Sequence, residues 1–293
     1  MWPQICEHIS IATHSPFELR TRLPVAGGCI NSAHVIEDGR GRKYFIKLND
    51  ATLAAMFEAE AAGLREIAQT NTLLSPDPIC HGIAGNTAYL VLTYLDLRGN
   101  NDAASQERLG QQLAAMHRAT APCHGWRIDN TLGSTPQINT PSSDWPAFWR
   151  EHRLGFQLEL AARNGYLGAL QRKGERLLAD MNAFFAGHTP APSLLHGDLW
   201  SGNYGIDTAG NPVIFDPAVY YGDRETDLAM TELFGGFTAR FYQAYNEAWP
   251  LDSGYRIRKN LYNLYHVLNH LNLFGGGYLP QAAGMVDGLL AEM

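Results

Sequence analysis

The chain has 293 residues, of which 45% are hydrophobic and 17% charged, and its formal net charge is −7 at pH 7. This composition is typical of a globular protein and excludes a disordered chain. The acidic balance argues against a nucleic-acid partner. No apolar stretch approaches the roughly 18 residues of a membrane span, and residues 1–10 lack the basic and apolar regions of a secretory signal. We therefore expect a cytoplasmic protein with no membrane partner.

The first third of the chain is predicted to form a β-rich lobe. Residues 17–49 contain short alternating strands and tight turns, among them the strand Tyr44–Leu48. Residues 51–69 change to helical spacing, and Thr87–Leu95 has the pattern of a buried strand. A polar run at residues 98–102 follows. We place a lobe boundary there, so that residues 1–95 form an N-terminal lobe and residues 96–293 a C-terminal lobe.

The rest of the chain is predicted to be mainly helical. Helical spacing is found at residues 106–120, 144–164, 170–187, 227–233, 238–249 and 256–274. A long loop occupies residues 121–143, and short strands are expected around residues 194–195 and 213–215. The fold class is therefore α+β, with a β-rich first lobe and a mainly helical second lobe.

Two polar segments of the second lobe indicate phosphoryl-transfer chemistry. Asp198 and Asn203 are separated by four residues, and Asp216 follows a short predicted strand. A kinase needs a carboxylate that accepts the proton of the attacking hydroxyl and oxygen ligands that hold magnesium against ATP, and this spacing supplies both. Each residue alone is more typical of a turn. Together they favour a kinase-type catalytic site.

A lysine in the first lobe is a candidate for the nucleotide site. Lys47 lies late in a predicted strand, and the following helix carries Glu58 and Glu60. In kinases, a strand lysine paired with a helix carboxylate positions the α- and β-phosphates. Lys47 alone would fit a surface lysine with its ammonium group in water, but the catalytic segment favours the ion pair. Glu60 is the preferred partner because Leu64 completes the E-x-x-x-L pattern of related kinase helices.

Two further segments are candidates for backbone contacts with the nucleotide. The turn at Gly27 and Gly28 can bring N–H groups close to phosphate, although two glycines are also common in an ordinary hairpin. Thr93, Tyr94 and Leu95 end the buried strand where a kinase has the hinge that binds adenine, and an ordinary core strand would have the same side chains.

Longer motifs extend over nearly the whole chain. The most informative are His196–Asn203 (HGDLWSGN), Phe215–Ala218 (FDPA), Tyr221–Met230, Phe234–Phe237 (FGGF) and Leu268–Gly275. Through them the sequence resembles the fructosamine kinase (ketosamine-3-kinase) family, a branch of the aminoglycoside-phosphotransferase-like kinases. His-Gly-Asp with a following Asn is shared by the wider superfamily, whereas Trp-Ser-Gly-Asn and Asn-His-x-Asn-x-Phe-Gly are much narrower.

The resemblance implies a protein-kinase-like two-lobe fold and an ATP- and Mg²⁺-dependent kinase. Its substrates would be ketosamines, which are sugar adducts of amines including protein lysines. Phosphorylation at the 3-hydroxyl makes such an adduct unstable, so that the amine is restored. In this scheme Asp198 is the base, Asn203 and Asp216 hold magnesium, and Lys47 and Glu60 form the nucleotide ion pair.

Four residues are candidates for substrate contacts. Trp200, next to the catalytic loop, would stack on the sugar or the lysine stem, or else pack in the core. Arg224 and Glu225 are either substrate contacts or members of a local ion pair. His270, on a helix, is equally consistent with substrate contact and with packing.

Three residues are expected to act in other ways. His196 is expected to orient the catalytic loop, and Asp227 to hold it through backbone N–H groups. Cys29 lies in the glycine turn and is either inert or open to an oxidation that blocks ATP binding or links two chains. The four cysteines are scattered, so no zinc site or disulfide framework is expected.

Two other functions stay open at this point. One is a related kinase acting on an aminoglycoside, choline or a sugar, from which the narrow motifs distinguish the ketosamine kinases. The other is a nucleotide-binding pseudokinase scaffold, against which the intact set of Lys47, Asp198, Asn203 and Asp216 argues.

Overall fold

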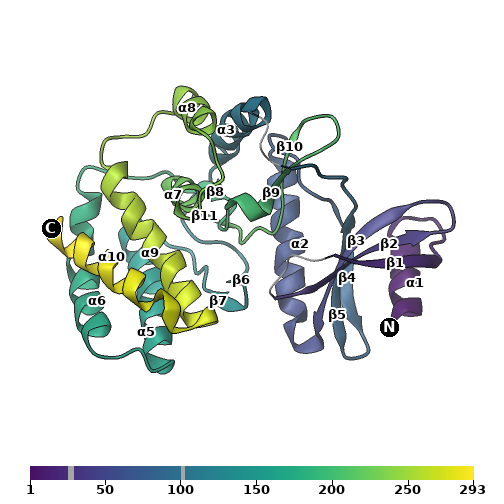
Figure 1. Ribbon diagram of the computed structural model, residues 1–293, viewed down its shortest axis with the longest axis horizontal. Helices are drawn as coiled ribbons and strands as arrows, with labels where there is room; N and C mark the ends of the chain where they lie inside the picture. Colours follow the sequence, from purple (N-terminus) through teal and green to yellow (C-terminus); the bar gives the residue numbers. More distant parts are fainter. Residues whose placement is uncertain (26–29, 100–102) are drawn as a thin grey trace. The chain divides into compact units, whose positions relative to one another are not determined.

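The computed structural model describes residues 1–25, 30–99 and 103–293 (Figure 1). Gly27, Gly28 and Cys29 lie outside the described residues, so the expectations for the glycine turn stay predictions. The chain divides into two compact units. The first is Met1–Asn100 with Tyr204–Pro217, and the second is Asn101–Asn203 with Ala218–Met293.

The first unit is built on an antiparallel sheet with the strand order β1-β2-β3-β5-β4. Its strands are β1 (Leu19–Val25), β2 (Ser32–Asp38), β3 (Lys43–Asp50), β4 (Pro78–Ala84) and β5 (Thr87–Thr93). The helices are α1 (Trp2–Ala12) and α2 (Ala54–Gln69), with a short 3₁₀ turn η1 (Ala51–Leu53) before α2.

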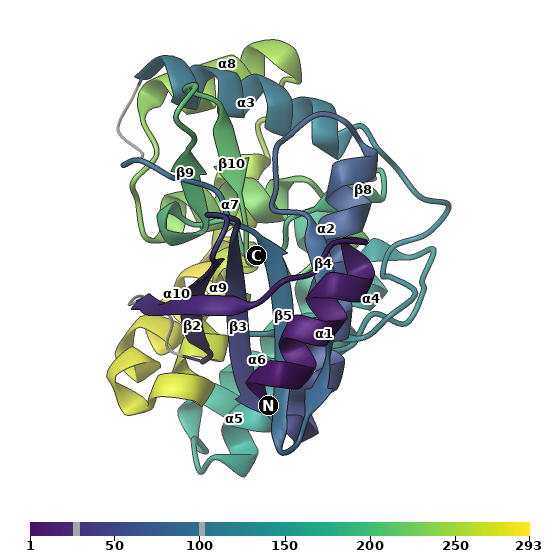
Figure 2. The ribbon, with the colours of Figure 1, turned by 90° about the vertical axis from the view of Figure 1, so that its right-hand side faces the viewer.

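The sheet has an apolar cluster on each face, because alternate side chains of a strand point to opposite sides. Tyr89 and Val91 of β5 belong to one cluster, together with Ile5 and Ile9 of α1. Ala88, Leu90 and Leu92 belong to the other, which contains Met56, Phe57, Ala61 and Leu64 of α2. The two helices therefore cover opposite faces of the sheet (Figure 2).

A hairpin from later in the sequence completes the first unit. It consists of β9 (Tyr204–Ile206) and β10 (Pro212–Ile214), and it forms backbone bridges from Ile206 to Arg98 and from Val213 to Leu74. The compact units thus differ from the expected division after Leu95, since residues 204–217 belong to the first unit, where Ile206 bridges to Arg98 and Val213 to Leu74. The assignment of nucleotide binding and catalysis to the two lobes stays a prediction.

The second unit is mainly helical, as expected. Its helices are α3 (Ala103–His117), α4 (Trp145–Trp149), α5 (Phe156–Arg163), α6 (Ala169–Asp180), α7 (Glu225–Leu233), α8 (Ala239–Ala248), α9 (Tyr255–Phe274) and α10 (Leu279–Ala291). Short turns are the π-helix η2 (Arg150–Gly155) and the 3₁₀ helices η3 (Met181–Phe185), η4 (Ser201–Asn203) and η5 (Gly276–Tyr278). Two small antiparallel pairs join β6 (Asn130–Leu132) to β7 (Thr135–Gln137) and β8 (Ser193–Leu195) to β11 (Tyr220–Gly222).

Aromatic rings fill much of the core of the second unit. Asp144 caps α4 by accepting a hydrogen bond from the backbone N–H of Ala147, which fixes the start of a helix that buries Trp145 and Trp149. The ring of Trp149 lies 4.9 Å from that of Tyr262 on α9, edge to face. Within the described residues, no helix combines the length and the apolar character that crossing a membrane requires.

Candidate active site

Three charged side chains meet at one point of the first unit. Lys47 lies on β3 opposite Leu90, so its side chain emerges on the face covered by α2. Its Nζ is 2.6 Å from Oε1 of Glu60 on α2 and 2.5 Å from Oδ1 of Asp216, which follows β10. The ion pair with Glu60 that the sequence favours is thus present in the structure.

The environment keeps Lys47 charged although the residue is only 4% exposed. Burial alone would lower the pKa of its ammonium group, but the carboxylates of Asp216 and Glu60 more than offset this effect and raise the pKa. A fixed cation between two carboxylates suits the binding of phosphate oxygens.

Asp216 has an unusual backbone conformation. Its φ is +56°, in the left-handed region that non-glycine residues seldom adopt, and its side chain is 46% exposed. Such outliers often occur at functional sites, where the surrounding structure holds them in place. A carboxylate oxygen of this kind is the hard donor that Mg²⁺ prefers, so Asp216 fits the role of a magnesium ligand.

The segment expected to act as a hinge begins at the end of β5. Thr93 is the last residue of that strand, and its backbone N–H donates to the carbonyl of Asp77 at 2.9 Å. Tyr94 and Leu95 follow outside the strand. Lys43 Nζ lies 5.7 Å from the centre of the Tyr94 ring. These contacts leave the adenine-binding role of the segment a prediction.

In the second unit, a sharp turn after β8 carries Asp198. Gly197 has a φ of +82°, and a Cβ atom there would lie 2.0 Å from the carbonyl oxygen of Ala218. Only glycine fits this turn. The N–H of Ala218 donates to the carbonyl of His196 at 2.8 Å, which ties the two segments together.

A buried carboxylate holds the same turn. Asp227 of α7 is 1% exposed and accepts hydrogen bonds from the backbone N–H of His196, at 2.7 Å, and of Gly197, at 2.9 Å. This confirms the expectation that Asp227 acts through backbone groups. His196 Nδ1 also accepts from the N–H of Asp198 at 3.3 Å, consistent with an orienting role.

Asn203 closes the turn onto Asp198. Its Nδ2 donates to the backbone carbonyl of Asp198 at 2.9 Å and to Oδ2 of the same residue at 3.2 Å. With the amide nitrogen on these oxygens, the Asn203 amide presents its oxygen, Oδ1, as the atom that can bind a metal. The chemistry of Asn203 thus also fits magnesium.

A set of aromatic rings lies beside the Asp198 turn in the second unit. Trp200 is 38% exposed, which argues against core packing, and its ring stands 6.3 Å from that of Phe234. Phe234 in turn lies 5.0 Å from the imidazole of His270. A Cβ atom on Gly202 would lie 2.2 Å from the Trp200 ring, so glycine in the Trp-Ser-Gly-Asn motif leaves space for the indole.

Glu225 belongs to a local ion pair, but its partner is Arg258 and not Arg224, whose side chain contacts backbone carbonyls and an aromatic ring. Glu225 is 1% exposed, and both of its carboxylate oxygens accept from Arg258, at 2.7 and 2.8 Å. Arg224 donates to the carbonyls of Trp249 and Pro250 and stacks 4.1 Å from the Trp249 ring.

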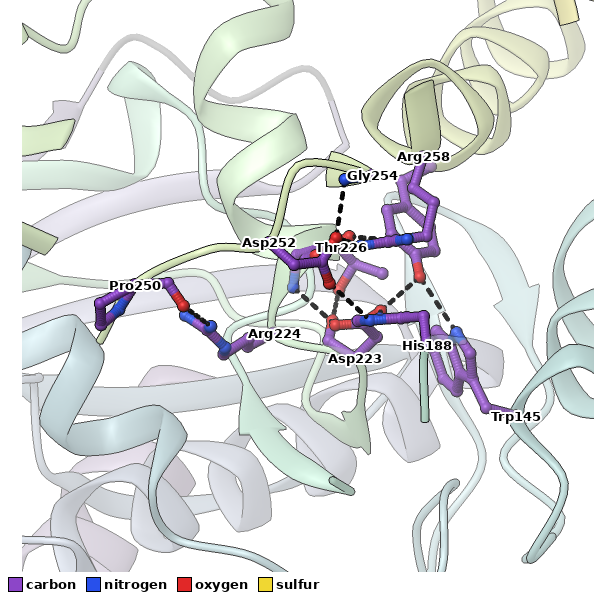
Figure 3. A network of polar contacts seen from close by, with 11 residues as sticks. Trp145, His188, Asp223, Arg224, Thr226, Pro250, Asp252, Gly254 and Arg258 are labelled. Carbon is purple, nitrogen blue, oxygen red and sulfur yellow. Dashed lines mark hydrogen bonds and ion pairs between the residues drawn. The ribbon is translucent and has the colours of Figure 1, made fainter. Parts of the chain in front are cut away.

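Sequence reasoning missed a polar network next to these two residues (Figure 3). Asp223 Oδ2 accepts from His188 at 2.6 Å and from Tyr262 at 2.5 Å. His188, Glu225 and Asp252 are close enough to suggest a metal site, but the Arg258 guanidinium binds both carboxylates and supplies the positive charge. His188 lies 35 residues from Asp223 and 64 residues from Asp252 in the sequence, so no local motif indicates the network.

Comparison with known proteins identifies the family. The family model described as "Fructosamine kinase" matches residues 1–292. The chain belongs to the fructosamine kinase family. It is 51% identical over 291 residues to a "probable ketoamine kinase" of Synechocystis sp., covering 97% of this chain and 95% of the relative. It is 44% identical over 269 residues to the chloroplastic protein-ribulosamine 3-kinase of Arabidopsis thaliana, covering 91% and 81%.

Solved structures of similar proteins support the assignment and confirm the fold class. A crystal structure from Haemophilus somnus, named "putative fructosamine-3-kinase", has a TM-score of 0.91 and 29% identity and covers 99% of this chain and 98% of that one. Aminoglycoside phosphotransferase APH(4)-Ia has a TM-score of 0.64 at 16% identity, with 98% of each chain covered. The fructosamine kinase family member described here therefore has the kinase-like fold that the motifs predicted.

Proposed function

We propose that this member of the fructosamine kinase family transfers the γ-phosphoryl group of ATP to the 3-hydroxyl of ketosamines. The relatives named as ketoamine kinase and protein-ribulosamine 3-kinase support this substrate class. The observation that carries the proposal is the Asp198 turn, which Asp227 and Asn203 hold in place in a chain that matches the family along almost its full length.

Lys47 is proposed to bind the α- and β-phosphates of ATP, with Glu60 fixing its position. Nucleotide use follows from the family, and one structural neighbour was solved with ADP. For the backbone contacts we retain Gly27, Gly28, Thr93, Tyr94 and Leu95 as proposals.

Asp198 is proposed as the general base. As the substrate oxygen forms its bond to the γ-phosphorus, the 3-hydroxyl proton passes to the Asp198 carboxylate, and the bond between the γ-phosphorus and the bridging oxygen of ADP breaks. Asn203 and Asp216 are proposed to bind Mg²⁺, which when bound offsets the charge of the phosphates.

Trp200 and His270 are proposed substrate contacts. An exposed indole offers an apolar face to the C–H groups of a sugar or to a lysine stem, and the ring series Trp200, Phe234 and His270 extends this surface. The substrate is either a free ketosamine or a glycated lysine of a protein, and its phosphorylation leads to loss of the sugar.

Mass spectrometry of lysine ketosamines incubated with ATP, magnesium and the protein tests the proposal. The panel contains fructosamine, ribulosamine and erythrulosamine adducts, both as free lysine and on a peptide. We expect a phosphate adduct with the wild type and a loss of turnover by a factor of about 10³ or more with Asp198→Asn, which still binds ATP. The proposal would be contradicted if the wild type phosphorylated aminoglycosides, choline or simple sugars but gave no product from any ketosamine.

A further inference from the structure

A buried series of hydrogen bonds leads to the carboxylate that holds the catalytic turn. His117, the last residue of α3, is completely buried, and its Nε2 lies 3.1 Å from Asp227 Oδ2. Its other ring nitrogen, Nδ1, is 2.8 Å from the hydroxyl of Tyr245 on α8. That hydroxyl is also 3.1 Å from Nη1 of Arg224, which precedes α7. We call Arg224, Tyr245, His117 and Asp227 the α3–α7–α8 chain.

The two end residues of the α3–α7–α8 chain, Asp227 and Arg224, fix the direction of the hydrogen bonds between its side chains. Burial alone would raise the pKa of the Asp227 carboxyl, but the hydrogen bonds it accepts, first that from His117, lower the pKa. Asp227 is therefore an anion that only accepts, and the guanidinium of Arg224 only donates. Nε2 of His117 must then carry a hydrogen, and the Tyr245 oxygen must accept from Arg224.

The middle of the chain follows from these ends. Burial raises the pKa of Tyr245, so that its hydroxyl keeps its hydrogen. With its oxygen accepting from Arg224, this hydroxyl donates to Nδ1 of His117. The imidazole tautomer with its hydrogen on Nε2 gives each of these groups a matching partner. The opposite tautomer would place the lone pair of Nε2 against the Asp227 carboxylate, which is unfavourable in a buried site.

We propose that His117 is a positioning residue for phosphoryl transfer: Tyr245 and Arg224 hold it in the Nε2–H tautomer, and it orients the Asp227 carboxylate that holds the Asp198 turn. The effect on turnover rests on the proposed function. The tautomer and the fixation of the turn are properties of the folded chain alone. Arg224 thereby has a role without contact to the substrate.

Loss of the His117 donor has a specific expected effect. Oδ2 of Asp227 accepts from both His117 and the N–H of His196, and Asp227 is too buried for bulk water to replace the missing donor. The carboxylate is then free to turn, and the peptide groups of His196 and Gly197 lose their fixed partner. A displacement of a catalytic group of about 1 Å is enough to lower turnover by a factor of about 100.

The first test measures the tautomer by ¹⁵N NMR of the full-length protein labelled on histidine. We expect one His117 signal pair with a protonated Nε2 and an unprotonated Nδ1, assigned by its absence in His117→Leu. In Tyr245→Phe, which removes the donor to Nδ1, this pure pattern is expected to change to a mixture. A wild-type His117 with hydrogen on Nδ1 would overturn the proposal.

The second test compares His117→Leu with His124→Leu. His124 is a second buried histidine of the same unit, and its ring packs 5.0 Å from Trp145. In His117→Leu we expect the His196 and Gly197 amides to exchange hydrogen at least about 10-fold faster, and kcat per folded molecule to fall about 10- to 100-fold with KM for ATP within about 2-fold. His124→Leu is expected to lose stability without these changes.

A conservative variant and the wild type separate the possible results. His117→Gln keeps a donor on Nε2 and is expected to recover part of kcat. Equal exchange and equal kcat in His117→Leu and His124→Leu would overturn the positioning role. If the wild type phosphorylates no ketosamine, the proposed function fails, whereas the NMR and exchange measurements still decide the role of His117.

Discussion

At the scale of single residues, the energetic cost of burying a charged side chain is offset by oppositely charged partners. Lys47 is buried between Glu60 and Asp216, and Arg258 between Glu225 and Asp252. Removing one member of such a group leaves an uncompensated charge, which costs more than the pair itself contributes. The identity of each partner therefore matters more than the number of ion pairs.

His188 gives a pH-dependent prediction. Burial alone would lower the pKa of His188, but Asp223 more than offsets this and raises it, while Glu225 acts in the same direction and Arg258 against it. Because the folded-state pKa is raised, protonated His188 stabilises the fold fully below its unfolded pKa of about 6.5, and this contribution is lost as the pH rises through the folded value. Asp252 also contacts the ring, at 3.0 Å.

We therefore expect His188→Gln to be less stable than the wild type by about 1–2 kcal/mol near pH 6, with a smaller difference at alkaline pH. Urea unfolding of both proteins between pH 5.5 and 9 measures this difference. His152→Gln is the control, because the pKa of His152 is lowered, chiefly by burial, so that its contribution does not decline with rising pH. A His188→Gln difference that stays constant or grows with pH would contradict the assignment.

At the scale of elements, close packing of α3 against α8 depends on a glycine. A Cβ atom on Gly110 would lie 2.4 Å from the carbonyl oxygen of Phe241 and 3.0 Å from the backbone nitrogen of Tyr245. Both neighbours are backbone atoms, so Gly110→Ala must separate the helices. We expect a loss of about 1–3 kcal/mol in the free energy of unfolding.

Gly284→Ala provides the matched control for that prediction. Gly284 lies within α10, and a Cβ atom there would have no neighbour within 4 Å. Alanine should therefore stabilise the helix by about 0.5–1 kcal/mol through its higher helix propensity. Chemical unfolding of the two variants should give changes of opposite sign, and equal changes would refute the steric explanation.

The sequence was most informative where the pattern is local. The continuous apolar run of β5 predicts a buried strand, and the spacing of Asp198 and Asn203 predicts that both lie in one turn. Helix α1 was not predicted, and only Ile5 and Ile9 of its residues are buried. Contacts such as that of His117 with Asp227 join residues 110 positions apart, so tertiary packing alone determines them.

At the scale of the whole molecule, the main difference from expectation is the hairpin of β9 and β10. From the sequence we expected residues 204–217 in the C-terminal lobe, whereas they belong to the first compact unit, in which Ile206 bridges to Arg98 and Val213 to Leu74. Asp216 thereby reaches Lys47, which lies 169 residues earlier. Pairing over such a distance depends on the fold and not on any local signal.

This arrangement leads to a prediction about nucleotide binding. Ligand that binds only the folded state at about 100 times its Kd stabilises a protein by about 2.7 kcal/mol, which for a chain of this size raises Tm by roughly 5–10 °C. We expect ADP with Mg²⁺ to raise Tm by this amount in the wild type and in Asp198→Asn. Lys47→Met should reduce the shift to about 2 °C or less, because the cation proposed to bind the phosphates is removed.

Lys43→Met is the control. Lys43 lies on the same strand, and its side chain is 44% exposed. Its ion pair with Glu37 is long, with 3.9 Å between Nζ and Oε2. Lys43→Met should keep the full shift, because an exposed pair of this length contributes little. Differential scanning fluorimetry at one nucleotide concentration compares all four proteins. A full shift in Lys47→Met would mean that Lys47, Glu60 and Asp216 form a structural group, and the nucleotide would then have to bind through other residues.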